Sequence, residues 1–203
     1  MRKMEFTAAF LYLCLVYLFT SCGQDSPDHN SPYSTELGVS DVEASIERGR
    51  FLVALMDCNS CHTPKMMTEQ GPVPDAARML SGHPGDQPFS GFEKADAPKG
   101  NWLLFNPDLT TAIGPWGVSF SANLTPDPTG LGNWTYEQFK MAITEGKHKG
   151  MENGRSLLPP MPWQSYAELK EEDIRAIFDY LGVIKPIENI VPPPIPPADL
   201  TMN

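Results

Sequence analysis

The pentapeptide Cys58-Asn59-Ser60-Cys61-His62 constrains this chain more than any other feature of its sequence. Two thiols one helical turn apart can each form a thioether bond to a haem vinyl group, and the adjacent imidazole then lies beneath the iron as an axial ligand. A chain that carries such a group has to fold as a pocket around it. The motif therefore predicts one haem c on Cys58 and Cys61, with His62 as an iron ligand.

A cysteine pair with this spacing has two other uses. A structural zinc site normally needs a second pair of cysteine or histidine ligands, and the sequence contains no second Cys-x-x-Cys and no His-x-x-x-His pair. A thioredoxin-like redox pair needs a surrounding βαβ pattern, whereas the residues before Cys58 have helical periodicity. Neither alternative fits the sequence as well as haem attachment.

The first residues predict export. A basic start at Arg2 and Lys3 precedes an apolar run that ends shortly before Cys22. This pattern is typical of a bacterial lipoprotein signal peptide over residues 1–21, and it leaves a lipid-modified Cys22 at the start of the cleaved chain. Ordinary secretory cleavage just before this cysteine is the alternative. We expect a protein on the periplasmic side of a bacterial membrane, anchored through lipid on Cys22.

The cysteine count and the charge agree with this assignment. The chain has four cysteines, of which Cys14 leaves with the signal peptide, Cys22 takes lipid and the remaining two take haem. No cysteine is left for a disulfide, so a large apolar prosthetic group has to supply cohesion. The net charge of −10 argues against nucleic acid as a partner. It is compatible with a basic docking face on a redox partner, and it serves solubility equally well.

Behind the signal peptide the sequence predicts a tether and then a helix. Residues 22–40 are polar and rich in Ser, Pro and Asp, as in flexible linkers. A capping box at Ser40 and Glu43 opens a run with helical periodicity, so we expect a helix over residues 41–57. Gly49 lies within this helix, where glycine lowers helix propensity, and it indicates the close approach of another backbone.

Two more helices and a tail follow later in the chain. Thr135 and Gln138 form a second capping box, which predicts a helix to about Glu145 that Gly146 ends. A last helix is expected over residues 171–181, with Gly182 as its stop. The tail, residues 188–203, is rich in proline and should be polyproline-like, either lying along the domain or projecting as a partner motif.

Between the haem motif and Asn123 the periodicity disappears. Residues 65–122 are rich in Gly, Pro, Asn and Asp and predict a long irregular insert. Disordered segments are poor in aromatic residues, so the rings of this insert are expected to pack on the haem or the core, with short strands around residues 101–105 and 116–120. These rings are Trp102, Phe105, Trp116 and Phe120.

A haem in an electron carrier needs a second axial ligand. Any methionine or histidine qualifies by chemistry, and the candidates are Met66, Met67, Met79, His83, His148, Met151 and Met161. Only Met161 lies between prolines and just before the terminal helix. Proline fixes φ and stiffens the segment, and a neutral thioether favours the ferrous state. Met161 is therefore the preferred ligand opposite His62.

Several segments together resemble a known family. The order of helix, Cys-x-x-Cys-His, loop, proline-flanked methionine and terminal helix is that of class I cytochromes c. The closer similarity is to the cytochrome c domains of quinohaemoprotein alcohol dehydrogenase cytochrome subunits and their monohaem relatives. The segments that carry it are residues 61–65 (CHTPK), 123–127 (NLTPD), 130–135 (GLGNWT), 160–163 (PMPW) and 171–174 (EEDI).

The resemblance implies an all-α class I cytochrome c fold over residues 41–187, interrupted by the long irregular insert. It implies haem c on the two cysteines, axial ligation by His62 and Met161, and a crossing of the first and last helices near Gly49. It further implies that Asn123, Trp134 and Trp163 line the haem pocket. The alcohol dehydrogenase subunits carry three Cys-x-x-Cys-His motifs and this chain has one, so one electron at a time is expected.

We therefore expect a periplasmic, membrane-tethered monohaem cytochrome c that is an electron carrier and not itself an enzyme. Its partners would be respiratory proteins, with a dehydrogenase as donor and an oxidase as acceptor. The alternative is a haem enzyme or sensor, peroxidase-like or gas-binding, whose distal iron site is open or whose Met161 is readily displaced.

Overall fold

The computed structural model describes residues 34–87, 89 and 102–201, with side chains from Val39 onward. The chain divides into two units, Met1–Gly38 and Val39–Asn203, and the second contains the haem motif. The expected signal peptide, the lipid site at Cys22 and most of the tether lie outside the described residues, as do residues 90–101 of the insert.

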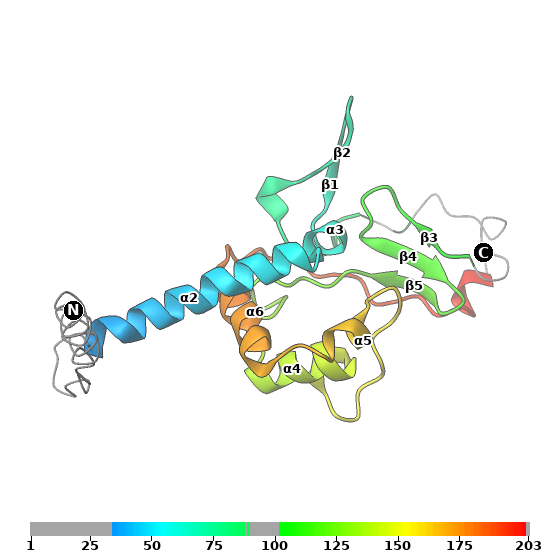
Figure 1. The fold of residues 1–203 in the computed structure, drawn as a ribbon. Helices are drawn as coiled ribbons and strands as arrows, with labels where there is room; N and C mark the ends of the chain where they lie inside the picture. Colours follow the sequence, from blue (N-terminus) through cyan, green and yellow to red (C-terminus); the bar gives the residue numbers. More distant parts are fainter. Residues whose placement is uncertain (1–33, 88, 90–101, 202–203) are drawn as a thin grey trace, which may run out of the picture. The chain divides into compact units, whose positions relative to one another are not determined.

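The described residues form both helices and small sheets (Figure 1). The helices are α2 (Ser34–Leu55), α3 (Cys58–His62), α4 (Tyr136–Glu145), α5 (Trp163–Tyr166) and α6 (Glu171–Val183), with short 3-10 turns η1 (Ala76–Arg78), η3 (His148–Gly150) and η4 (Asp199–Thr201). The strands are β1 (Lys65–Thr68), β2 (Gly71–Pro74), β3 (Leu104–Phe105), β4 (Thr111–Gly114) and β5 (Gly117–Phe120). The expectation of an all-α fold is therefore wrong.

The main hydrophobic core lies among α2, α4 and α6. In each helix the buried positions recur every three or four residues, which brings their side chains to one face. Burial of such side chains stabilises a fold by about 1.5–3 kcal/mol each. The buried cluster comprises Leu52, Val53, Leu80, Leu131, Tyr136, Phe139, Ile143, Ile174, Ile177 and Leu181.

Gly49 is the point where α2 crosses α6, as expected. A Cβ atom at this position would lie 1.9 Å from the carbonyl oxygen of Ala176 and 2.7 Å from the Cβ atom of Tyr180. Both distances are far below van der Waals contact, so only glycine lets the two backbones approach this closely. The crossing holds the helix before the haem motif against the terminal helix.

The helix ends agree with the sequence in part. In α4 the capping box of Thr135 and Gln138 is present in both directions, and Gly146 ends the helix in a left-handed conformation, which confirms both predictions. The other two long helices differ from expectation. α2 begins at Ser34, seven residues before Asp41, so Ser40 is no N-cap, and α6 continues through Gly182 to Val183.

The insert contains two antiparallel sheets, so the prediction of an irregular segment is wrong for much of it. β1 pairs with β2, and the order β3-β4-β5 forms the second sheet, in which Gly114 lies opposite Gly117. Short strands near residues 101–105 and 116–120 are confirmed by β3 and β5. The aromatic residues did not all pack inward, because Trp102 is 76% exposed and Phe105 is 43% exposed.

The tail lies along the domain, which confirms the first of the two possibilities. Ile195 exchanges two backbone hydrogen bonds with Val118 of β5, at 2.8 and 3.1 Å. The side chain of Asn189 donates to the carbonyls of Ser81 and His83 at 2.6 and 2.9 Å and accepts from the amide of Gly85 at 2.8 Å. The tail therefore joins the insert to the end of α6 as part of the fold.

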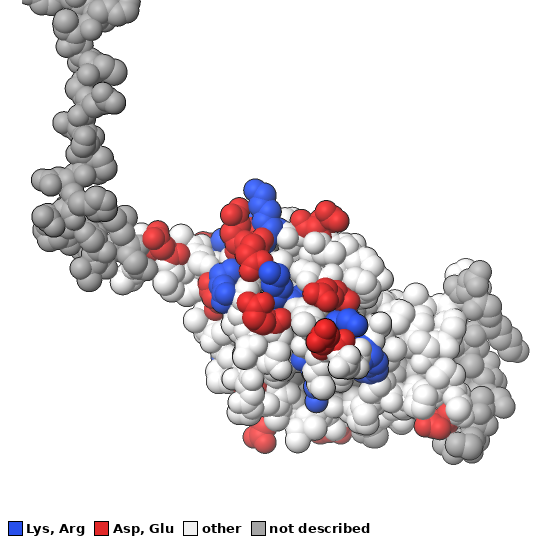
Figure 2. Space-filling model, turned by 90° about the horizontal axis from the view of Figure 1, so that it is seen from below, with Lys and Arg blue, Asp and Glu red and all other residues white. Residues whose placement is uncertain are grey.

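Charged side chains of both signs gather together on the face shown in Figure 2, and much of the neighbouring described surface is uncharged. Two ion pairs join different helices, Arg48 to Asp173 at 2.8 Å and Lys140 to Glu171 at 2.6 Å. Such exposed pairs contribute little to stability. On this face the negative net charge does not form a continuous acidic surface. No helix in the described ranges is long and apolar enough to cross a membrane.

Replacing Gly49 with alanine should separate α2 from α6. We expect the free energy of unfolding to fall by at least about 2 kcal/mol, because the added methyl group meets backbone that cannot yield. Chemical denaturation of the haem-loaded protein measures this. Gly182→Ala is the matched control, since a Cβ atom there meets nothing within 4 Å, and it should be neutral or stabilise by up to about 1 kcal/mol. Equal effects of the two substitutions would contradict the proposed crossing.

Replacing Asn189 with alanine should loosen the tail from the insert. The change removes three side-chain hydrogen bonds and leaves their backbone partners unsatisfied, so we expect a loss of about 2 kcal/mol in unfolding free energy. Hydrogen exchange should show faster exchange at the amides of Gly85 and Ile195. The exposed Asn153 provides the control, and its alanine variant should leave both measurements unchanged.

Candidate haem-binding site

The haem motif forms its own short helix, α3, which the sequence did not predict, since the expected helix over residues 41–57 ended just before Cys58. Asp57 lies between α2 and α3 and directly precedes the first residue of α3. It adopts a left-handed conformation, with φ 56° and ψ 37°, which interrupts the helical backbone between the two helices. Within α3 the side chains of Cys58 and Cys61 are three residues apart and so lie on the same side of the helix. The two thiols are thus presented together, immediately before His62.

The His62 side chain is held in one orientation. It is only 8% exposed, and its Nδ1 atom lies 2.7 Å from the carbonyl oxygen of Ala122. A carbonyl can only accept, so Nδ1 carries the proton and Nε2 keeps its lone pair. Burial lowers the pKa of His62, which favours this neutral form. A neutral imidazole with a fixed ring and a free Nε2 is what an axial iron ligand requires.

Further hydrogen bonds stabilise the chain just after the motif. Thr63 is fully buried, donates from its hydroxyl to the Asn59 side chain at 2.9 Å and accepts from the amide of Leu80 at 2.9 Å. The carbonyl of His62 accepts from the amide of Gly82 at 2.8 Å. Sequence reasoning missed Ala122 and Leu80, because backbone groups are present at every residue and their use leaves no trace in residue type.

The two thiols are half-buried and unpaired. Burial raises the pKa of Cys58 to about 11, and it also raises the pKa of Cys61. Redox-active Cys-x-x-Cys pairs have lowered pKa values, so this pair differs from them. Within the described residues no group of three or more His, Cys, Asp or Glu side chains is placed to hold a metal ion. Two thiols one turn apart beside a fixed imidazole fit a covalent haem.

Exposure separates the methionine candidates for the second ligand. An axial sulfur has to be shielded from water when the haem is bound, yet four of the five candidates are exposed: Met66, Met67, Met79 and Met151. Met161 is half-buried. It follows a cis peptide bond between Pro159 and Pro160, and its amide donates to the carbonyl of Leu158 at 3.4 Å. Met161 is thus the methionine among these candidates whose burial fits the role.

The helix after Met161 packs against the same core as the haem motif. Tyr166 of α5 and Cys58 of α3 are both half-buried against the hydrophobic cluster, and burial raises the pKa of Tyr166. At the start of α5 the indole of Trp163 lies over Gly146, with Cε2 2.4 Å from where a Cβ atom of Gly146 would be. The segment that carries Met161 is therefore held between the end of α4 and the haem motif.

Of the two histidine candidates for the second iron ligand, His83 is buried and His148 is half-buried. His83 is buried, its Nδ1 lies 2.8 Å from the Thr110 hydroxyl and 3.1 Å from the Thr111 hydroxyl, and its ring packs against Phe120. It therefore belongs to the insert. His148 is half-buried, and its amide donates to the carbonyl of Arg155 at 2.9 Å.

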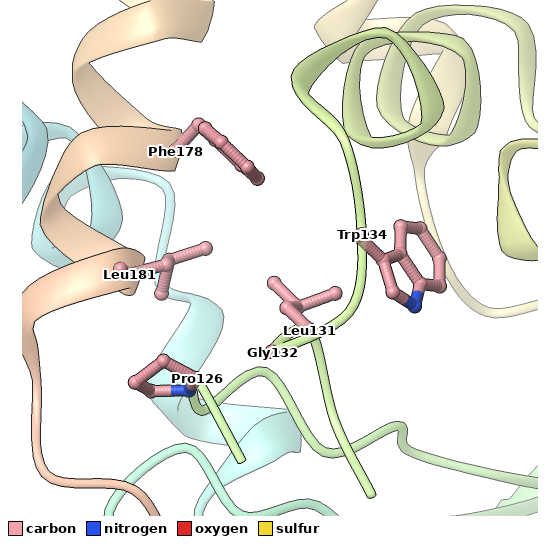
Figure 3. Close-up of a pocket in the computed structure, with 7 residues that line it drawn as sticks. Pro126, Leu131, Gly132, Trp134, Phe178 and Leu181 are labelled. Carbon is pink, nitrogen blue, oxygen red and sulfur yellow. The ribbon is translucent and has the colours of Figure 1, made fainter. Parts of the chain in front are cut away.

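Asn123 and Trp134 lie on the segment between the insert and α4. The Asn123 side chain accepts from the amide and hydroxyl of Thr125 and donates to the carbonyl of Ile187 at 2.8 Å, so the fold already uses its polar atoms. Trp134 is half-buried against the core. Figure 3 shows it beside a cavity of about 180 Å³, with its indole turned away from Phe178 and Leu181. Lining of a haem pocket by Asn123, Trp134 and Trp163 stays a prediction.

Several known proteins are similar in sequence to this chain over about two thirds of its length. The gluconate 2-dehydrogenase cytochrome c subunit of Pantoea cypripedii is 32% identical over 139 residues, covering 68% of this chain and 23% of that protein. The cytochrome c subunit of the quinone alcohol dehydrogenase of Gluconobacter oxydans (strain 621H) is 31% identical over 147 residues, covering 71% and 23%. The fructose dehydrogenase cytochrome subunit of Gluconobacter japonicus is 30% identical over 146 residues, covering 71% and 22%.

The chain spans less than a quarter of the length of these relatives. A family model described as cytochrome c matches residues 46–185, which include the haem motif, α4, Met161 and the whole of α6. Because this match covers well over half of the sequence, the chain belongs to the cytochrome c family.

Proposed function

We propose that this protein is an exported monohaem cytochrome c of the class I type that carries single electrons between respiratory partners. Its haem c is attached to Cys58 and Cys61, and His62 and Met161 are the axial ligands. The observation that carries the proposal is the geometry of α3, where two half-buried thiols stand beside an imidazole whose Nδ1 is bonded to Ala122. A haem bound there supplies one-electron oxidation and reduction of iron.

The structure restricts the motion of the two residues proposed as iron ligands. The bond to Ala122 prevents the His62 ring from rotating, and the contact of Trp163 with Gly146 fixes the start of the helix after Met161. Two ligands that move little between the ferric and ferrous states keep the reorganisation that accompanies electron transfer small. The protein thus acts by holding ligands in place, and no substrate conversion of its own is proposed.

The donor is proposed to be a dehydrogenase and the acceptor a terminal oxidase. Similarity to cytochrome subunits of gluconate, alcohol and fructose dehydrogenases supports the first of these. This sequence contains one Cys-x-x-Cys-His motif, so the chain itself would pass one electron at a time. Its place is the periplasmic side of a bacterial membrane, tethered through lipid on Cys22.

Replacing Met161 with alanine tests the second ligand. We expect the wild-type haem to be six-coordinate and low-spin, with a methionine-to-iron charge-transfer band in the ferric spectrum. In Met161→Ala this band should disappear completely and the reduced protein should bind carbon monoxide, because the sixth position is open. Met151→Ala removes a methionine that is exposed and should leave the spectrum unchanged.

A variant Met161→Ala that keeps the charge-transfer band would show that another sulfur binds the iron. Ready binding of carbon monoxide by the reduced wild-type protein would instead favour a haem enzyme or sensor with a displaceable distal ligand. The first result contradicts the assignment of Met161 as the ligand, and the second contradicts the proposed electron carrier.

Replacing Cys22 with serine tests the anchor. A thioether-linked lipid needs the cysteine sulfur, so Cys22→Ser should move the haem protein from the membrane fraction to the soluble periplasmic fraction, with its haem spectrum intact. Cell fractionation followed by haem staining measures the distribution. Wild-type protein recovered mainly in the soluble fraction would argue for ordinary secretory cleavage.

A further inference from the structure

The amino group of Lys65 is enclosed by three backbone carbonyl groups. Nζ donates to the oxygen atoms of Ser60 at 2.5 Å, Asp108 at 2.6 Å and Thr63 at 3.3 Å. An ammonium group has three N–H donors, so each has a partner. The side chain is half-buried. This is a fixed position for a charge, unlike that of a lysine that extends into solvent.

Two of these carbonyls belong to the haem motif or border it. Ser60 lies within α3 and Thr63 directly follows it, so both carbonyls lie at the end of a helix where no further turn supplies amide donors. Lys65 satisfies them from its own side chain. The third carbonyl, of Asp108, lies in the turn between β3 and β4. Lys65 therefore connects the haem motif to the sheet of the insert.

The charge of Lys65 is not neutralised by its partners. The three acceptors are neutral carbonyl groups, and the carboxylate of Asp108 is used by the amide and hydroxyl of Thr110 at 3.0 and 2.7 Å. None of the ion pairs found among the described residues includes Lys65. The chain thus holds a positive charge at the end of α3 that no described carboxylate pairs with directly.

The field of this charge reaches the attachment site. Lys65 Nζ is bonded to the carbonyl of Ser60, the residue before Cys61, and to the carbonyl of Thr63, the residue after His62, so the charge is held beside both residues. The sulfur of Cys61 is one of the two proposed haem attachment points. A charge that acts on this sulfur also acts on the group bonded to it.

We propose that Lys65 is a positioning residue that sets the haem reduction potential, by holding a positive charge beside the attachment site. Reduction adds one electron from the redox donor to ferric iron and forms no new bond, so the site becomes more negative by one charge. A nearby fixed cation stabilises the reduced form. Two unit charges about 10 Å apart at an effective dielectric constant of about 20 shift an equilibrium on the order of tenfold. The inference rests on the proposed attachment of haem to Cys58 and Cys61.

Three substitutions separate charge from hydrogen bonding. Lys65→Met removes both the charge and the donors, Lys65→Gln removes the charge and keeps amide donors, and Lys65→Arg keeps the charge and the donors. Lys185→Met is the control, since it removes the same charge from an exposed side chain. The measurement is an equilibrium redox titration of each haem-loaded protein, with the ferric spectrum recorded to confirm unchanged ligands.

We expect Lys65→Met and Lys65→Gln to lower the ferrous-to-ferric ratio at a fixed ambient potential by about three- to tenfold, with the low-spin spectrum retained. Lys65→Arg and Lys185→Met should stay within about twofold of the wild type. A wild-type ferrous-to-ferric ratio in both neutral variants would overturn the proposal. An equal decrease of this ratio in Lys65→Arg would also overturn it, because the effect would then come from altered packing and not from charge. If Lys65→Met does not bind haem, Lys65→Gln and Lys65→Arg are compared instead. A lower ferrous-to-ferric ratio in the Gln variant alone supports the proposal, and equal ratios in the two variants overturn it.

Failure of this inference is distinguishable from failure of the proposed function. The haem content and thioether linkage of the wild-type protein, measured by haem staining after denaturing electrophoresis, test the attachment to Cys58 and Cys61 without reference to Lys65. A covalent haem whose potential is insensitive to Lys65 overturns only the proposed role of this lysine.

Discussion

The hydrogen bond from His62 Nδ1 to the carbonyl of Ala122 is the constraint on which much of this structure depends. It spans 60 residues of sequence and closes the insert into a loop that begins and ends at the haem motif. Gly82 bonds to the His62 carbonyl, and Lys65 bonds to the carbonyl of Asp108, so the insert is attached at three points along its length. The insert is therefore joined to the haem motif, and the orientation of the His62 imidazole depends on how the insert folds.

The sequence predicted those parts of the fold whose causes are local. The capping box at Thr135 and the glycine at position 146 define both ends of α4 through neighbouring residues, and both are present in the structure. Gly49 also predicted the helix crossing, because glycine lowers helix propensity and so indicates the close approach of another backbone. The sheets of the insert were not predicted in full, since strands of two to four residues show little alternation. Their stability comes from pairing with one another and, at Val118, with Ile195 of the distant tail.

The candidate site also has one part that the sequence predicts and one part that only the structure shows. The Cys-x-x-Cys-His motif is contiguous, so its chemistry could be inferred from residue types and spacing alone. The groups that support it are backbone carbonyls, as at Ala122 and Asp108, and only the three-dimensional structure can identify them. Among the five candidate methionines, flanking prolines favoured Met161 in the sequence, and burial favours it in the structure. The two arguments are independent, which strengthens the preference for this sulfur.

The position of the Met161 segment depends in turn on the end of α4. Gly146 has φ 66°, a conformation that favours glycine, and the Trp163 indole occupies the space that a side chain would fill. The carbonyl of Gly146 also accepts from the amide of Leu157 at 2.6 Å, so both sides of the methionine segment are attached to one residue. A helix end defined by local capping thus determines where a distant loop lies. The segment that carries Met161 is thus held by the same kind of backbone constraint that holds the His62 ring.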